Sequence, residues 1–151
     1  MLDIAGPFTQ AGTLFGKGAL PVIERSKAFL EERHKVIAHN IANVNTRYYK
    51  AIDLPEDDFQ HLLGRAIRYR DEKPIKVFEM VHNDRVWGDW GGNDDFQRIP
   101  NNEGILRHGD NNVDIDKQVA MMSRNQMLFK TMNSLARKQY DLLRSTIRET
   151  A

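Results

Sequence analysis

The sequence predicts a mainly α-helical protein in which a long helix near each end pairs lengthwise with the other, around a short β-containing or irregular middle segment. Two observations support this. Apolar doublets recur every seven residues near both ends, and the segment between them lacks this period. Such a repeat keeps one stripe of a helix facing a partner over several turns. The doublets are Val22-Ile23, Phe29-Leu30 and Val36-Ile37 near the N-terminus, and Met121-Met122, Leu128-Phe129, Leu135-Ala136 and Leu142-Leu143 near the C-terminus.

The same pattern divides the chain into parts. Residues 1–17 mix Gly, Thr and apolar side chains without a period, and we expect a flexible N-terminal arm there. Residues 18–46 and 113–149 are expected to form one discontinuous helical domain, in which the two helices pair as in a coiled-coil-like tube. Residues 47–112 form the middle segment, with loops and short strands.

The ends of the two long helices carry recognisable signals. Pro21 suits a first helical turn, where its missing N–H is not needed, and we expect this helix to end near Asn43. The final helix is expected over residues 115–148. Asp114 or a neighbouring Asn can cap it, and Asp116 favours the positive end of its dipole.

The middle segment has weaker signals. A short helix is expected over residues 57–67, and strands are expected over residues 75–99, which begin with the β-prone run 75–81. Turns are expected at Asn83-Asp84 and over residues 91–94, and a polar loop over residues 100–112.

A row of mostly polar residues lies between the two members of the doublets. It consists of Ser26, Arg33 and Asn40 in the first helix, and Gln118, Asn125, Met132 and Gln139 in the last. An ordinary dimeric coiled coil would place apolar residues there. Either the helices are loosely amphipathic members of a small bundle, or each faces two neighbours at once with amides fixing the register.

Composition limits the class of protein. The 151 residues have no Cys, which excludes disulfides and thiolate sites, and no apolar run reaches the roughly 18 residues of a membrane span. No basic segment followed by an apolar core indicates a cleaved signal peptide. The net charge is +1, but residues 53–116 carry 8 basic and 15 acidic side chains, whereas residues 117–148 carry 7 basic and 1 acidic.

The basic side chains of the last helix face away from its doublets: Lys117, Arg124, Lys130, Arg137, Lys138 and Arg144. They form a solvated face, bind nucleic acid or anionic lipid, or contact acidic middle segments of neighbouring copies.

No pattern indicates catalysis. The five His residues are scattered, and the acidic pairs are typical of turns and caps. No Gly-rich loop joins a strand to a helix. Trp87 and Trp90 form either a binding surface or, as is more common for aromatic residues, the core of a small sheet. We therefore expect no catalytic, cofactor-binding or metal-binding residues, and no small-molecule substrate.

Two segments resemble one protein family. Residues 40–51, NIANVNTRYYKA, are similar to the N-I-A-N-x-x-T-P-G-Y-K-A signature that ends the first helix of flagellar rod and hook proteins. Residues 110–117, DNNVDIDK, are similar to the D-G-N-N-V-D-x-D segment before the last helix of the smallest rod subunits. The chain thus resembles the FlgB class of flagellar basal-body rod proteins, found in the proximal rod. The shared positions are Asn40, Ala42, Asn43, Thr46, Tyr49, Lys50, Asn111, Asn112, Asp114 and Asp116.

The chain departs from these signatures at two places. Arg47-Tyr48 replaces Pro-Gly, and Gly109-Asp110 inverts Asp-Gly. After Thr46, a turn that needs Gly at positive φ therefore cannot be assumed. We expect Asn43, Asn45 and Thr46 to form a side-chain-bonded exit from the first helix, followed by a looser segment that orders only against an adjacent subunit.

The resemblance implies a structural subunit without catalysis. It implies export through the flagellar type III channel without a cleaved signal, and self-assembly in the periplasm as part of the hollow rod. The implied partners are other rod proteins, the rod-to-ring adaptor, the membrane ring and the export gate. The expected subunit-packing residues are Ile23, Phe29, Leu30, Val36, Ile37, Met122, Leu128, Phe129, Leu135, Leu142 and Leu143. The alternatives are a soluble helical adaptor or chaperone-like module and, less favoured, a nucleic-acid-binding protein.

Overall fold

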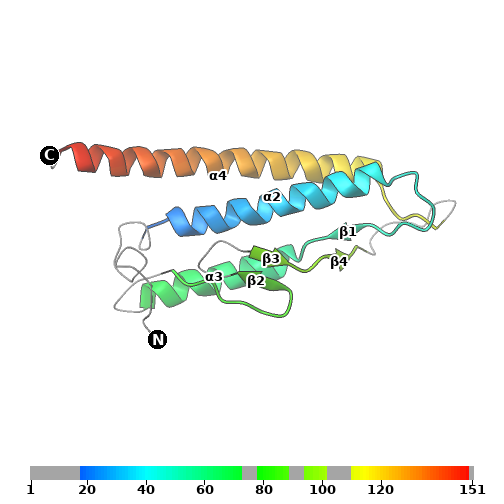
Figure 1. Ribbon diagram of the computed structural model, residues 1–151, viewed down its shortest axis with the longest axis horizontal. Helices are drawn as coiled ribbons and strands as arrows, with labels where there is room; N and C mark the ends of the chain where they lie inside the picture. The colour runs from blue at the N-terminus through cyan, green and yellow to red at the C-terminus, as the bar shows by residue number, and fades with distance from the viewer. Residues whose placement is uncertain (1–17, 73–77, 89–93, 102–109, 150–151) are drawn as a thin grey trace, which may run out of the picture.

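Two long antiparallel helices form the body of the protein (Figure 1). The computed structural model describes residues 18–72, 78–88, 94–101 and 110–149. Helix α2 (Leu20–Ala42) and helix α4 (Ile115–Glu149) lie side by side over most of the length of α2. On the other side of α2 lies a layer formed by helix α3 (Glu56–Glu72) and four short strands. The predicted class, mainly α with paired long helices and a strand-containing middle, is confirmed.

The long helices begin and end close to the predicted residues. Helix α2 has Pro21 in its first turn, and Asn43 is its C-cap. Helix α4 begins directly after Asp114, whose Oδ1 accepts from the backbone N of Asp116 at 3.0 Å and of Lys117 at 3.4 Å. Asp114 is therefore the predicted N-cap, because it satisfies two amides that the helix itself cannot.

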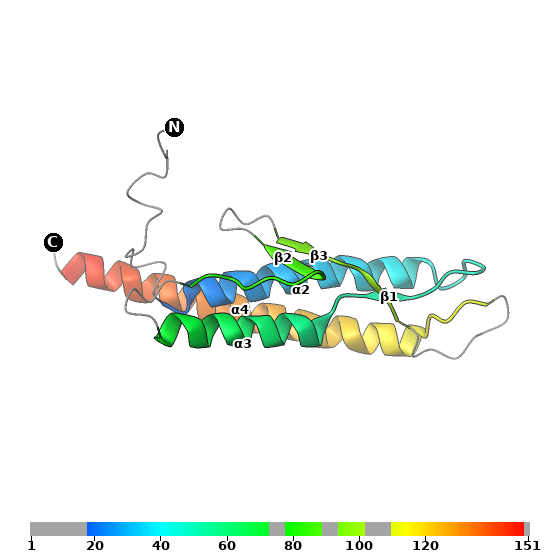
Figure 2. The same cartoon turned by 90° about the horizontal axis from the view of Figure 1, so that it is seen from below.

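The middle segment is more helical than expected. Helix α3 covers 17 residues instead of the short stretch 57–67, and Glu56, Asp57 and Asp58 lie in its first turn, where carboxylates favour a helix. Strands β1 (Ile52–Asp53) and β4 (Ile99–Pro100) pair antiparallel. Strands β2 (Val86–Gly88) and β3 (Asp94–Phe96) form a second antiparallel pair, with Val86 opposite Phe96 (Figure 2).

The predicted details of the middle segment have different outcomes. Residues 78–81 form no strand. Phe78 is buried there and Met80 and Val81 pack against the core, so this apolar run serves packing rather than pairing. The Asn83-Asp84 turn is present, because the Asn83 side chain accepts from the backbone N of Arg85 and of Val86. Several predicted features lie outside the described residues: the arm 1–17, the run 75–77, and the side chains of Trp87 and Trp90. The same holds for the expected turn over 91–94, except for Asp94, which begins β3.

The core lies between α2 and the middle segment. The rings of Phe29 and Phe59 stack with centroids 4.2 Å apart, and Phe96 meets both rings edge-on at 5.3 and 6.0 Å. Offset-stacked and edge-on rings are the favoured arrangements of aromatic pairs. The other buried members of this cluster are Val36, Leu54, Leu62 and Val86. This core holds the middle segment against α2.

The polar row between the doublets is largely buried. Ser26, Asn40, Gln118 and Asn125 are between 1% and 8% exposed. Asn40 pairs with Gln118 across the two helices, and Asn125 donates to the backbone O of Leu30 at 2.8 Å. Helix α2 thus faces two neighbours at once, but both belong to its own chain: α4 on one side and the middle segment on the other. Buried amides need these partners, so they favour this register over a shifted one.

Candidate functional site

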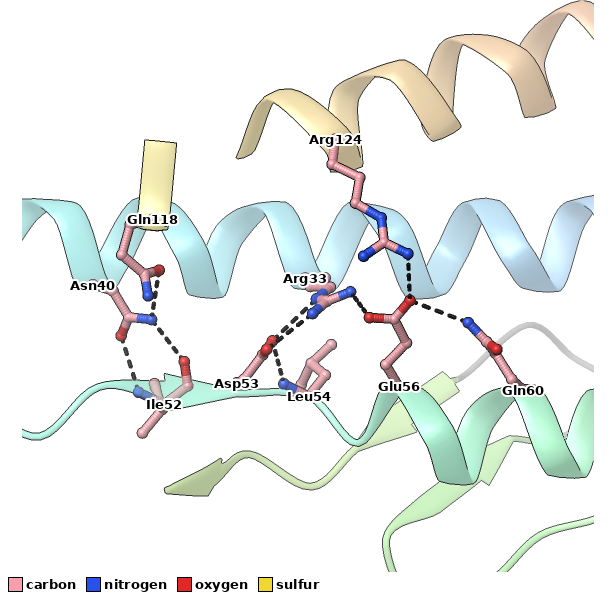
Figure 3. A network of polar contacts seen from close by, with 9 residues as sticks. All are labelled: Arg33, Asn40, Ile52, Asp53, Leu54, Glu56, Gln60, Gln118 and Arg124. Carbon is pink, nitrogen blue, oxygen red and sulfur yellow. Dashed lines mark hydrogen bonds and ion pairs between the residues drawn. The ribbon is translucent and has the colours of Figure 1, made fainter. Parts of the chain in front are cut away.

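The two family-like segments meet at the end of α2. We call the region formed by residues 40–52 and 110–118 the junction. It joins the last turn of α2, strand β1 and the first turn of α4 (Figures 1 and 3). Sequence similarity alone could not say that the two segments touch, because more than 50 residues separate them.

Asn40 connects the three elements of the junction and is 1% exposed. Its Nδ2 donates to the backbone O of Ile52 at 2.6 Å and to Oε1 of Gln118 at 3.1 Å. Its Oδ1 accepts from the backbone N of Ile52 at 3.1 Å and from the Tyr49 hydroxyl at 2.8 Å. The amide thus uses two donors and two acceptor positions, its full capacity. A Leu or Asp here would leave buried partners unsatisfied.

Tyr49 donates to Asn40 as a neutral phenol. Burial raises the pKa of the Tyr49 hydroxyl, although the nearby charge of Arg98 partly opposes this. The shift favours the protonated form, which is the form that can donate to Asn40. The family-motif positions Asn40 and Tyr49 thus belong to one hydrogen-bonded group.

Asn111 binds the exit from α2. Its Nδ2 donates to the backbone O of Asn43, Val44 and Thr46 at 2.8–3.0 Å, and its Oδ1 accepts from the backbone N of Val113 at 2.7 Å. These three carbonyls lie in the turn that follows α2, so a single amide from the segment before α4 holds this turn by sharing its two N–H groups among them.

Asn112 holds the strands beside the junction. Its Oδ1 accepts from the backbone N of Ala51 at 2.6 Å, and its Nδ2 donates to the backbone O of Asn101 at 2.7 Å. Lys50 Nζ donates to the backbone O of Asp110 at 2.7 Å. Asn111 and Asn112 are both 5% exposed. The predicted polar loop over 100–112 therefore ends in two buried side chains that donate and accept hydrogen bonds, and Pro100 belongs to β4.

The exit from α2 is compact. Asn43 Nδ2 donates to the backbone O of His39 at 2.9 Å, and the Thr46 hydroxyl donates to Asn43 Oδ1 at 3.2 Å, as the sequence predicted for these two residues. Asn45, predicted to share this role, is exposed. The expectation of a loose segment that orders only against a neighbouring subunit is wrong for 43–50, because contacts within the chain hold it.

The two departures from the family motifs keep the backbone of a glycine. Tyr48 has φ 61° and Asp110 has φ 58°, and both occupy positions where the motifs have Gly. Left-handed backbone costs a non-Gly residue about 1–2 kcal/mol. The surrounding hydrogen bonds to Asn43, Thr46 and Lys50 fix the chain on either side, so the turns persist without glycine.

Arg33 forms a second polar group that sequence reasoning missed. Its guanidinium donates to Asp53 from Nε at 3.1 Å and from Nη2 at 2.9 Å, and to Glu56 from Nη1. Gln60 and Arg124 reach the other oxygen of Glu56, at 3.1 and 4.0 Å (Figure 3). Burial lowers the pKa of Arg33, but the two carboxylates outweigh it and raise the pKa above its usual value.

This group ties α2 to β1 and to the start of α3. The Arg33 side chain is 12% exposed and that of Asp53 is 14% exposed, so the pair is largely removed from water. The sequence held one signal for this group: Arg33 lies in the polar row, between apolar doublets of the helix. A charged residue there needs a buried partner of opposite charge.

The predicted subunit-packing residues divide into two sets. Those of α2 are buried inside the chain: Ile23, Phe29, Leu30, Val36 and Ile37. Those of α4 are half-buried or exposed: Met122, Leu128, Phe129 and Leu143 are half-buried, while Leu135 is 42% and Leu142 is 52% exposed. Packing against another subunit remains a prediction, and α4 is the helix with surface left for it.

Other kinds of site find no support in the described ranges. No group of three or more His, Cys, Asp or Glu side chains there could hold a metal ion. None of the described helices is long and apolar enough to cross a membrane.

The fold and the junction define a class of protein: two long paired helices whose ends are tied together by asparagines of the two motif-like segments. No protein-family model matches the chain. The chain is 24% identical over 131 residues to the flagellar basal body rod protein FlgB of Bacillus subtilis (strain 168), covering 86% of this chain and 93% of that protein. This is a distant homology, and it supports a relation to flagellar rod proteins.

Proposed function

We propose that the chain is a structural, non-catalytic subunit of the bacterial flagellar basal-body rod, in its proximal part. The observation that carries the proposal is the junction. Two separate segments that resemble rod-protein motifs form one hydrogen-bonded unit around Asn40 and Asn111. A generic helical adaptor has no need for these asparagines at these positions.

The homology adds further support, because it covers most of both chains. In the proposed role the subunit leaves the cell by flagellar type III export without a cleaved signal. It then self-assembles with other rod proteins in the periplasm, near the rod-to-ring adaptor, the membrane ring and the export gate. Helix α4 supplies the packing surface, since part of its apolar stripe is open.

The test uses basal bodies purified from cells that lack the chain and carry a plasmid copy. The wild-type copy is expected to restore rods seen by cryo-electron microscopy, and a copy lacking residues 116–151 is not. Lys130→Ala, on an exposed position of α4, serves as the matched control and is expected to restore rods. Rods built without residues 116–151 would overturn the proposal, as would complete rods in cells without the chain.

A further inference from the structure

The apolar doublets do not determine by themselves at which level α4 pairs with α2. Helix α2 carries three doublets and α4 carries four, all spaced by seven residues. The hydrogen bond between Asn40 and Gln118 marks the observed register. Counted from this pair in opposite directions, the three doublets of α2 lie at the levels of the first three doublets of α4. Lys27 lies over the ring of Phe129 at 6.0 Å, in agreement with this alignment.

A second register, displaced by one heptad, matches the doublets equally well. In the observed register Val22-Ile23 lies at the level of Leu135-Ala136, and in the second it would lie at the level of Leu142-Leu143. Helix α4 continues past the start of α2, and Leu142 is 52% exposed there (Figure 1). The register therefore decides whether α2 faces the first or the last doublet of α4.

The polar row of α4 fits the second register as well. Asn125 is 3% exposed, and its Nδ2 donates to the backbone O of Leu30 at 2.8 Å. Its Oδ1 is the one buried side-chain oxygen or nitrogen of the described residues that has no hydrogen-bond partner. One heptad along, Asn125 reaches the level of Asn40 and takes the place of Gln118. Its Oδ1 can then accept from Asn40 Nδ2, as Gln118 Oε1 does now at 3.1 Å.

The junction opposes this displacement. Seven residues of helix correspond to about 10 Å along the axis, so the segment before α4 would leave the turn after α2 and strand β1. The hydrogen bonds lost are those of Asn111 to Asn43, Val44 and Thr46, of Asn112 to Ala51 and Asn101, and of Lys50 to Asp110. These bonds form only in the observed register, and they distinguish it from the second.

We infer that the junction holds α4 in one of two registers that the helices allow, and that Asn125 makes the second register possible. With the junction formed, Leu142-Leu143 stays beyond the doublets of α2. When a contact with another molecule opens the junction, α4 moves by one heptad, α2 covers this doublet and Met121-Met122 is uncovered instead. The inference goes beyond the proposed rod function and does not depend on it.

Distances between two spin labels on the full chain test the inference by double electron–electron resonance. The sequence has no Cys, so Glu31→Cys and Arg148→Cys, at exposed positions of α2 and α4, take the labels specifically. The chain with an intact junction is expected to give one distance. Asn111→Ala combined with Asn112→Ala opens the junction. It should add a second population whose distance is about 10 Å shorter, because the end of α4 moves toward Glu31.

Two matched substitutions in the opened chain separate the registers, since each replaces one buried amide of the polar row by Leu. Asn125→Leu should remove the shorter distance, because Asn40 would lack a partner in the second register. Gln118→Leu should increase the shorter population, because Asn40 would lack a partner in the first register alone. Asn45→Ala, at an exposed position of the turn after α2, should leave the single longer distance unchanged.

Circular dichroism checks that each variant folds. A single longer distance in the opened chain, a broad distribution without a shorter maximum, or equal effects of Asn125→Leu and Gln118→Leu would overturn the inference. If the opened chain does not fold, the two Leu variants are compared with the junction intact. Gln118→Leu should then show the shorter distance and Asn125→Leu only the longer one, and identical distributions would overturn the inference.

Discussion

Helices α2 and α4 share one sequence pattern and end in different surroundings. Both carry apolar doublets every seven residues with a polar row between them. In α2 the residues Phe29, Leu30, Val36 and Ile37 are all less than 10% exposed, whereas in α4 Leu135 and Leu142 are 42% and 52% exposed. The difference arises because α4 covers one side of α2 and the middle segment covers another. A heptad pattern reports which face of a helix is apolar, and not what covers that face.

The sharpest test of this comparison places the same carboxylate in each helix. Ile37 is 1% exposed, so Ile37→Asp buries an unpaired charge and should cost about 4 kcal/mol or more of unfolding free energy. Leu142→Asp, at a half-exposed position, should cost less than about 0.5 kcal/mol. Urea unfolding followed by far-UV circular dichroism measures both. Equal losses would mean that the chain does not bury α2 and expose α4 as described.

Substitution of Arg33 tests how much the contact between α2 and the middle segment contributes to stability. Arg33→Ala leaves the carboxylates of Asp53 and Glu56 facing each other without their cation, at a largely buried place. We expect a loss of about 3 kcal/mol in the same urea experiment. Lys35→Ala removes an exposed cation from the same helix and should change nothing measurable. If both variants unfold alike, the Arg33 pair does not hold the middle segment against α2.

Substitution of Asn111 tests how much the hydrogen bonds between the segment before α4 and the turn after α2 contribute to stability. Asn111→Ala removes the donor to three carbonyls in the turn that follows α2, and should cost about 2 kcal/mol. Hydrogen exchange should increase first at the last turn of α2 and at residues 43–46. Asn45→Ala, an exposed asparagine of the same segment, is the control. Unchanged exchange at the end of α2 in the Asn111 variant would contradict the proposed role of this side chain.

The smallest expected effect is a gain in stability. Tyr48→Gly relieves a left-handed residue that is 71% exposed, so little packing is lost, and should stabilise the chain by about 1 kcal/mol. Asp110→Gly should act in the same direction. Arg47→Gly, at a neighbouring exposed position, should not stabilise. Thermal unfolding compares the three, and a loss of stability in Tyr48→Gly would show that its ring makes contacts that outweigh the backbone cost.

The sequence predicted the structural features that depend on residues close together in the chain. The heptads predicted both long helices, and Asp114 predicted the start of α4, because periodicity and capping act within a few residues. The full length of α3 was missed because its apolar residues follow no long repeat. The partners of Asn40 and Arg33 could not be predicted, since Gln118 lies 78 residues and Glu56 lies 23 residues further along the chain.

The comparison with family motifs identified residues but not their contacts. It selected Asn40, Asn111 and Asn112, which the structure places in one region, but it did not show which groups they bond to. It also led to the expectation of a looser segment where Arg47-Tyr48 replaces Pro-Gly. Tyr48 and Asp110 keep the left-handed backbone because bonds from Asn111 and Lys50 determine the path of the chain. Tertiary contacts here override the local preference of a residue.

The bonds of Asn111 also set an order of events during folding. The carbonyls of Asn43, Val44 and Thr46 accept from a side chain that lies 65–68 residues later. Closing so long a loop has an entropic cost that must be met before the contact contributes anything. A chain that emerges N-terminus first therefore completes the turn after α2 only after most of its length is available. Until then local bonds hold this turn, such as the bond from the backbone N of Thr46 to the backbone O of Asn43 at 3.0 Å.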